Sequence, residues 1–160
     1  MVPFSSSDNF EEIYERNVET IYRICYIYLK NVQDTQDAVQ DTFLKLIEKN
    51  VTFSSEEHEK YWLIKVSVNI CKNMLSHWSR KNVEIEKADV PSTSKETSDV
   101  IEQISKLPEK LKIVVYLHYY DGYTSEEIGK MLHITASGVR NRLQRAKAML
   151  KTIIDEERKG

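Results

Sequence analysis

Apolar side chains recur every three or four residues along the N-terminal half of the chain, which is the spacing of one face of a helix. The pattern predicts helices over about 7–29, 34–49 and 57–79, with a polar loop at 50–57 between the last two. Helices of this length can bury one another's apolar faces. This half is therefore predicted to form a bundle of three to four helices.

The second and third predicted helices carry apolar stripes. The stripe of the second helix consists of Ala38, Val39, Thr42, Phe43, Leu46 and Ile47. We interpret it, Phe43 included, as core rather than as a binding surface, and we predict Gln33 or Asp34 as the N-cap. The third helix has Trp62, Val66, Asn69, Ile70 and Met74 on or near one face. At such a position Trp62 is assigned to the core.

The helical pattern is interrupted between Asn82 and Thr97, where proline and serine occur together and acidic residues outnumber basic ones. This composition predicts a flexible linker. A second helical unit is predicted to begin near Ser98, to break at Pro108 and to continue through Tyr119. Gly122 then follows, in the position of a helix C-terminal glycine.

Thr124 and Glu127 have the spacing of a capping box, in which each side chain bonds the other residue's backbone amide at the start of a helix. The predicted helix is short, because His133 and Ile134 begin a tight turn after it. A second helix is predicted from about Thr135 to Asp155. Two short helices joined so closely must cross steeply, which is the geometry of a helix-turn-helix.

The faces of that second helix differ in character. Its apolar stripe is Val139, Leu143, Ala146, Leu150 and Ile153. Its opposite face carries Ser137, Asn141, Gln144 and Ala148, flanked by Arg140 and Arg145. Small polar and amide side chains bracketed by guanidinium groups suit base edges in a major groove with phosphates on either side.

Composition supports an all-α fold, because the 160 residues include only three prolines and four glycines. A chain of this length can form one domain or two small helical domains; the interruption favours two, at 1–81 and 98–160, joined by the linker 82–97. No apolar run is long enough to span a membrane, and the N-terminus has no export signal. The sequence therefore predicts a cytoplasmic protein without membrane insertion.

The sequence contains no pattern typical of an enzyme or a metal site. Phosphate-binding glycine loops, metal-ligand spacings and nucleophile motifs are absent, so neither a catalytic residue nor a cofactor is predicted. Cys25 and Cys71 lie far apart in sequence and are interpreted as packed thiols. The four histidines are scattered and are interpreted as structural or surface residues.

The net charge of -2 conceals an uneven distribution. Acidic residues predominate from Asp8 to Glu48, whereas basic residues predominate from Glu59 to Lys81 and again from Glu126 to Lys151. Two separate basic regions indicate two contacts with a polyanion, and the acidic region indicates a surface kept for another partner.

One series of C-terminal residues matches a known motif. It comprises Leu107-Pro108-Glu109, Val114, Leu117, Tyr119, Gly122, Glu127-Ile128, Leu132, Ile134, Val139 and Arg142-Leu143-Gln144-Arg145-Ala146-Lys147. The series resembles the promoter -35 binding region of extracytoplasmic-function (ECF) sigma factors, of the sigma-70 superfamily. Gly129 replaces the usual alanine, a change between small residues that costs some helix propensity.

The N-terminal half supplies independent support for this resemblance. Asp34, Asp37, Val39, Gln40, Asp41 and Phe43 match one family block, and Trp62-Leu63, Val68-Asn69 and Lys72-Asn73 match a second. The usual Ala-Glu after the first aspartate is Thr35-Gln36 here, so the start of that helix carries less negative charge. Both blocks occur in the expected order and cover nearly the whole chain.

The resemblance implies a transcription initiation factor that binds core RNA polymerase and promoter DNA, is regulated by an anti-sigma factor and has no catalytic activity. Polymerase binding is expected at Asp37, Gln40 and Asp41. Binding of the opened -10 element is expected at Lys65, Asn69, Lys72, Asn73, Trp78, Arg80 and Lys81, with a flipped base read by the 50–57 loop together with Asn69 and Asn73. Binding of the -35 element is expected at Ser137, Arg140, Asn141, Gln144, Arg145 and Lys147.

An alternative from another class is a dimeric helix-turn-helix regulator that acts without polymerase, with the N-terminal half as a sensor or dimerisation module. The Asp34 to Phe43 block and the second basic region argue against it.

Overall fold

The computed structural model describes the backbone of residues 7–81 and 95–159 and the side chains of residues 9–78 and 99–156. Within these ranges the regular elements are α-helices, as the all-α prediction requires, with one π-helical turn. The chain divides into two compact units, Met1–Asp89 and Val90–Gly160. Most of the predicted linker, 82–94, lies outside the described residues.

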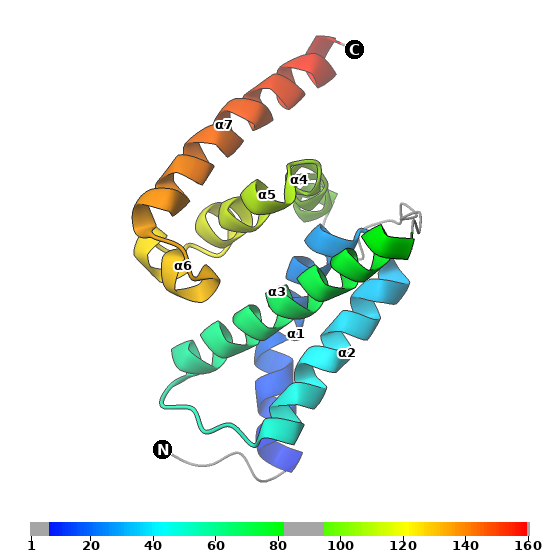
Figure 1. The fold of residues 1–160 in the computed structure, drawn as a ribbon, viewed down its shortest axis with the longest axis vertical. Helices are drawn as coiled ribbons and strands as arrows, with labels where there is room; N and C mark the ends of the chain where they lie inside the picture. Colours follow the sequence, from blue (N-terminus) through cyan, green and yellow to red (C-terminus); the bar gives the residue numbers. More distant parts are fainter. Residues whose placement is uncertain (1–6, 82–94, 160) are drawn as a thin grey trace. The chain divides into compact units, whose positions relative to one another are not determined.

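The N-terminal unit is a bundle of three helices. α1 (Ser7–Leu29), α2 (Val32–Lys49) and α3 (Glu56–Lys81) pack side by side, each against the other two (Figure 1). The shared core contains Ile21, Ile24, Leu29, Ala38, Phe43, Leu46, Leu63, Ile64 and Val68. The predicted helices are thus confirmed, with ends that differ by no more than two residues.

The N-cap of α2 differs from the prediction. The cap is Asn31, whose backbone is extended at φ -146° and ψ 153°, and not Gln33 or Asp34. The Asn31 Oδ1 atom accepts a hydrogen bond from the Asp34 amide at 2.9 Å, and its Nδ2 donates to the Asp34 carboxylate at 2.7 Å. One asparagine side chain therefore satisfies both an unpaired amide and a carboxylate, and the helix begins two residues earlier.

The buried face of α3 also differs from the predicted one. Leu63, Ile64, Ser67, Val68 and Cys71 are buried, whereas Trp62, Val66, Ile70 and Met74 are half-buried and Asn69 is exposed. The core assignment of Trp62 is therefore wrong. The sequence pattern did not predict this face because the face includes a serine. Ser67 can be buried because its hydroxyl donates to the Ile64 carbonyl at 2.8 Å and so needs no water.

Cys25 of α1 and Cys71 of α3 are both fully buried and free, as expected of packed thiols. The two thiols are hydrogen-bonded. This bond, together with burial, raises the pKa of Cys25 well above its usual value, so the group stays in the thiol form.

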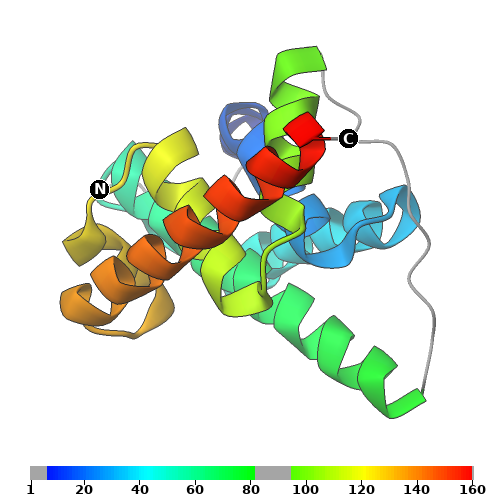
Figure 2. The same cartoon turned by 90° about the horizontal axis from the view of Figure 1, so that it is seen from above.

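The C-terminal unit consists of α4 (Lys95–Ser105), α5 (Glu109–Val115), the π-helical turn Tyr116–Tyr120, α6 (Ser125–Leu132) and α7 (Ala136–Lys159). α7 packs against both α5 and α6, and Figure 2 shows it crossing above them. The core here contains Ile101, Leu111, Val114, Leu117, Ile128, Val139, Leu143 and Ala146. The predicted break at Pro108 is confirmed, as is the left-handed Gly122 at φ 79°.

Gly129 lies where α6 meets the turn that follows it. Its carbonyl accepts a hydrogen bond from the Ile134 amide at 3.0 Å, and a Cβ atom on Gly129 would lie 2.6 Å from the Ile134 carbonyl oxygen. That oxygen belongs to the backbone, so it cannot rotate away. The absence of a side chain at Gly129 therefore permits the close approach of α6 and the turn.

We expect Gly129→Ala to destabilise the C-terminal unit by about 1–3 kcal/mol, the usual cost of forcing an extra methyl group into a packed site. Urea unfolding followed by circular dichroism measures this change. Lys130→Ala is the control, because Lys130 is the exposed neighbour on the same helix. Equal stability of Gly129→Ala and the wild type would show that the turn can relax.

Candidate functional site

The helix-turn-helix predicted from the sequence is formed by α6 and α7. The Thr124 Oγ1 atom accepts a hydrogen bond from the Glu127 amide at 3.1 Å, and the Thr124 amide donates to the Glu127 carboxylate at 3.0 Å. α6 ends at His133, which has a left-handed φ of 59°. The Thr135 Oγ1 atom then accepts from the Gly138 amide at 2.9 Å, which caps the first turn of α7.

α7 presents one polar face to solvent. Every predicted -35 residue is exposed: Ser137, Arg140, Asn141, Gln144, Arg145 and Lys147. The opposite face of α7 packs into the core. Val139, Leu143 and Ala146 are buried there, and Leu150 and Ile153 are half-buried. Burial of that stripe determines which side of the helix is free to enter a groove.

Arg140 is also in contact with α6, which the sequence did not indicate. Its Nη1 atom lies 3.3 Å from the Glu126 carboxylate. Both side chains are largely exposed, so the pair adds little stability. The contact places the guanidinium group near the junction of the two helices.

Four of the predicted -10 residues lie on the side of α3 away from its core: Asn69, Lys72 and Asn73 are exposed, and Lys65 is half-buried. They form one strip along the helix, with two cations and two amides. Trp78 lies outside this strip: it is half-buried and follows buried Cys71 by seven residues, which places it on the core side of the helix. The side chains of Arg80 and Lys81 lie outside the described residues.

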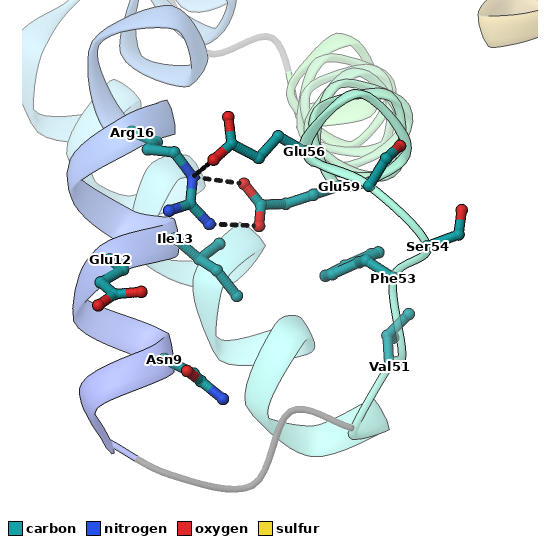
Figure 3. A pocket seen from close by; sticks show the side chains of 10 residues that line it. Asn9, Glu12, Ile13, Arg16, Val51, Phe53, Ser54, Glu56 and Glu59 are labelled. Carbon is teal, nitrogen blue, oxygen red and sulfur yellow. Dashed lines mark hydrogen bonds and ion pairs between the residues drawn. The ribbon is translucent and has the colours of Figure 1, made fainter. Parts of the chain in front are cut away.

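The connection from α2 to α3 borders a pocket of about 310 Å³, shown in Figure 3. α1 contributes Asn9, Glu12, Ile13 and Arg16, and the facing side consists of Val51, Phe53, Ser54, Ser55, Glu56 and Glu59. The connection itself is held by His58. The His58 Nδ1 atom accepts from the Ser54 amide at 3.2 Å, and the Ser55 hydroxyl accepts from the His58 amide at 3.0 Å.

Phe53 also holds the connection from α2 to α3 in place, through aromatic contacts. Its ring stands edge-on to His58, at 5.4 Å between centroids, and to Trp62, at 5.8 Å. Trp62 is therefore a support for the loop rather than a core residue.

α2 presents Asp37, Gln40 and Asp41, the predicted polymerase-binding residues, all exposed. Gln40 also borders an apolar groove of about 630 Å³ between α1 and α2. The groove is lined by Phe10, Tyr14, Val18, Tyr22, Gln36, Val39, Gln40, Phe43, Leu44 and Ile47. Phe43 is buried, as predicted, but Leu44 is 45% exposed and Ile47 is 49% exposed.

The core assignment of Ile47 is therefore wrong. Successive helix residues are rotated by about 100°, so burial of Leu46 leaves Ile47 at the edge of the buried face. Exposed acidic residues follow lining residues in the sequence of both helices: Glu11 and Glu15 in α1, and Asp37, Asp41 and Glu48 in α2. We call the apolar lining together with these acidic neighbours the α1/α2 groove.

In the part of the chain that the structure describes, no three His, Cys, Asp or Glu side chains gather as a metal site would require. Among the helices described there, none has the length and apolar content needed to cross a membrane.

Two helical units, one of them with an exposed polar face on a helix-turn-helix, define a DNA-binding protein. The family model for sigma-70 region 2 matches residues 13–81, and the model for sigma-70 region 4 matches residues 98–150. The chain belongs to the sigma-70 family, in its ECF group, and acts as a sigma factor that directs RNA polymerase to promoters. The region 2 match is not expected of the alternative, a dimeric regulator without polymerase docking.

Known proteins of similar sequence and fold agree with this assignment. The ECF RNA polymerase sigma factor SigW of Bacillus subtilis is 26% identical, over 90% of this chain and 88% of its own length. The sigma factor RpoE of Bartonella quintana, solved with the anti-sigma factor NepR, has a TM-score of 0.78 at 18% identity, over 92% of this chain and 97% of its own. CnrH, solved with the cytosolic domain of CnrY, has a TM-score of 0.72 at 19% identity, over 95% and 91% of the two chains.

Proposed function

We propose that α7 recognises the promoter -35 element in the major groove. The observation that carries this proposal is that α7, the second helix of a complete helix-turn-helix, exposes one polar face. Ser137, Asn141 and Gln144 would contact base edges, and each well-made bidentate contact contributes about 1–3 kcal/mol of discrimination. Arg140, Arg145 and Lys147 would contact phosphates, which set the register but carry little sequence information.

The -10 element is assigned to α3 and to the loop that precedes it. Lys65 and Lys72 are spaced to follow the phosphates of a single strand, and Asn69 and Asn73 offer amide groups to an unpaired base. The loop at 50–57 takes part in reading a flipped base. Trp78 is the stacking candidate, and Arg80 and Lys81 extend the basic strip by sequence alone.

The docking surface for core RNA polymerase consists of Asp37, Gln40 and Asp41, extended by the neighbouring α1/α2 groove. Exposed Leu44 and Ile47 supply apolar contact area, which acidic groups alone do not provide. The acidic neighbours of the groove suit a partner with basic flanks and favour fast association. The sequence analysis assigned Ile47 to the core and did not single out Leu44.

The two DNA-binding units act as domains 1–81 and 98–160, joined by the linker 82–97. Tethering makes the second contact intramolecular and so raises its effective concentration. Opening of the -10 element draws on binding energy, since a captured unpaired base offsets the cost of unstacking. No catalytic step is needed. The chain acts without a cofactor in the cytoplasm, where its polymerase works.

An anti-sigma factor is the proposed regulator. Two proteins of the same fold have been solved with protein partners, one of them an anti-sigma factor. The exposed apolar residues of the α1/α2 groove support the same proposal, because a protein that covered them would also block polymerase.

We expect Gln144→Ala and Arg145→Ala each to weaken binding of the holoenzyme to promoter DNA about 5- to 100-fold, which corresponds to about 1–3 kcal/mol. Affinity for core polymerase should stay unchanged, because α7 lies outside the N-terminal unit. Gel-shift titration at fixed salt measures the first quantity and fluorescence anisotropy the second. Lys110→Ala is the control, since it removes an exposed cation from α5. If either variant lost both promoter binding and polymerase affinity, the assignment of these two functions to different units would be wrong.

The double variant Gln40→Ala, Asp41→Ala should show the reverse pattern. We expect its affinity for core polymerase to fall about tenfold or more, because these groups lie at the centre of the docking surface. Binding of the isolated protein to -35 duplex DNA should not change. Glu102→Ala, an exposed acid of α4, is the control. Unchanged polymerase affinity of the double variant would show that α2 is not part of the polymerase interface.

Run-off transcription by core polymerase, with and without this protein, tests the function as a whole. Promoter-specific transcripts should appear only when the protein is present.

A further inference from the structure

An ion pair between exposed Arg16 and buried Glu59 joins α1 to the first turn of α3 beside the loop (Figure 3). The Arg16 Nη2 atom donates to Glu59 Oε1 at 2.8 Å, and its Nε donates to Oε2 at 3.2 Å. The Asn17 Nδ2 atom donates to the same Oε2 at 2.8 Å and to the Ile13 carbonyl at 2.8 Å. We call these three side chains, Arg16, Asn17 and Glu59, the α1/α3 clamp.

The clamp is specific in its geometry. The Glu59 side chain is only 5% exposed, so its charge needs partners that stay in place. Arg16 supplies a two-pronged contact that lysine could not reproduce. The hydrogen bonds that Arg16 donates to Glu59 raise the pKa of Arg16 above its usual value, which keeps the guanidinium group charged. An apolar contact would hold two helices together without this directional requirement.

The loop depends on the first turns of α3 for its position. Its polar attachments run to His58, and the Phe53 ring rests on His58 and Trp62. These residues flank Glu59 on the same helix. A shift of the first turn of α3 would therefore carry the loop with it, and the clamp is what ties that turn to α1.

The pocket shows the consequence of this arrangement. Arg16 and Glu59 both line it, with α1 on one side and the loop on the other. The ion pair therefore spans the pocket from α1 to the first turn of α3. Arg16 and Glu59 are distant in sequence and belong to different helices, so no motif marked them.

We propose that Arg16 and Glu59 are positioning residues for promoter opening: they set the place of the 50–57 loop through α3 without touching DNA. This inference rests on the proposed role of the loop in capturing the opened -10 strand. It predicts that damage to the clamp impairs strand capture while polymerase docking and -35 binding persist.

The test uses holoenzyme made with Glu59→Gln, which keeps an acceptor for Asn17 but removes the charge. We expect affinity for a single-stranded non-template -10 oligonucleotide to fall about tenfold. The rate of open-complex formation on duplex promoter should fall in parallel, whereas a template with the -10 region already unpaired should be less affected. Affinities for core polymerase and for -35 duplex DNA should stay within about twofold of the wild type, less than half the free-energy change of a tenfold loss.

Glu19→Gln is the matched control, because the exposed Glu19 carboxylate pairs with half-buried Arg23 within α1 at 3.9 Å. It should leave all four measurements unchanged. Addition of Arg16→Gln to Glu59→Gln should cause little further loss of strand affinity, because the main partner of Arg16 is already changed. Its other partner, Glu56, is 76% exposed and lies 3.7 Å away, so that contact contributes little. Additive losses would show that the residues act separately and would overturn the proposal.

Arg16→Lys tests the same idea if Glu59→Gln does not fold. The Arg16 side chain is 36% exposed, so lysine is tolerated there, but its single ammonium group loses the two-pronged contact. Strand affinity should fall several-fold at unchanged polymerase affinity. Wild-type strand affinity in a folded clamp variant, or an equal loss of strand and polymerase affinity, would overturn the proposal. A wild-type protein that fails to bind core polymerase would instead refute the proposed function.

Discussion

The close approach of Gly129 to the turn after α6 is the constraint on which the C-terminal unit depends. Because Gly129 has no side chain, the Ile134 carbonyl oxygen can lie 2.6 Å from the place of a Cβ atom, and the Ile134 amide bonds the Gly129 carbonyl at 3.0 Å. Burial of Val139 and Leu143 then leaves a single polar face of α7 toward solvent. The exposure of that face is thus a consequence of packing.

The N-terminal unit depends on contacts between helices. The α1/α2 groove and the cationic strip of α3 lie on different helices. The α1/α3 clamp joins α1 to the first turn of α3. Its directional bonds to the buried Glu59 carboxylate specify the register of the two helices more strictly than a purely apolar contact does.

Surface contacts and buried contacts contribute differently to this protein. The exposed pair of Arg140 with Glu126 adds little stability. Buried groups, by contrast, determine shape and are expensive to disturb.

The sequence by itself determined the helices, the capping box at Thr124 and the polar face of α7, because these features depend on residues a few positions apart. Its motifs also indicated the family. It could not show that Asn31 caps α2, that Trp62 supports a loop, or that Ile47 is exposed, because these depend on which neighbours cover each face. Only the tertiary structure brought Arg16 to Glu59, since a pairing between residues 43 positions apart leaves no local periodic trace.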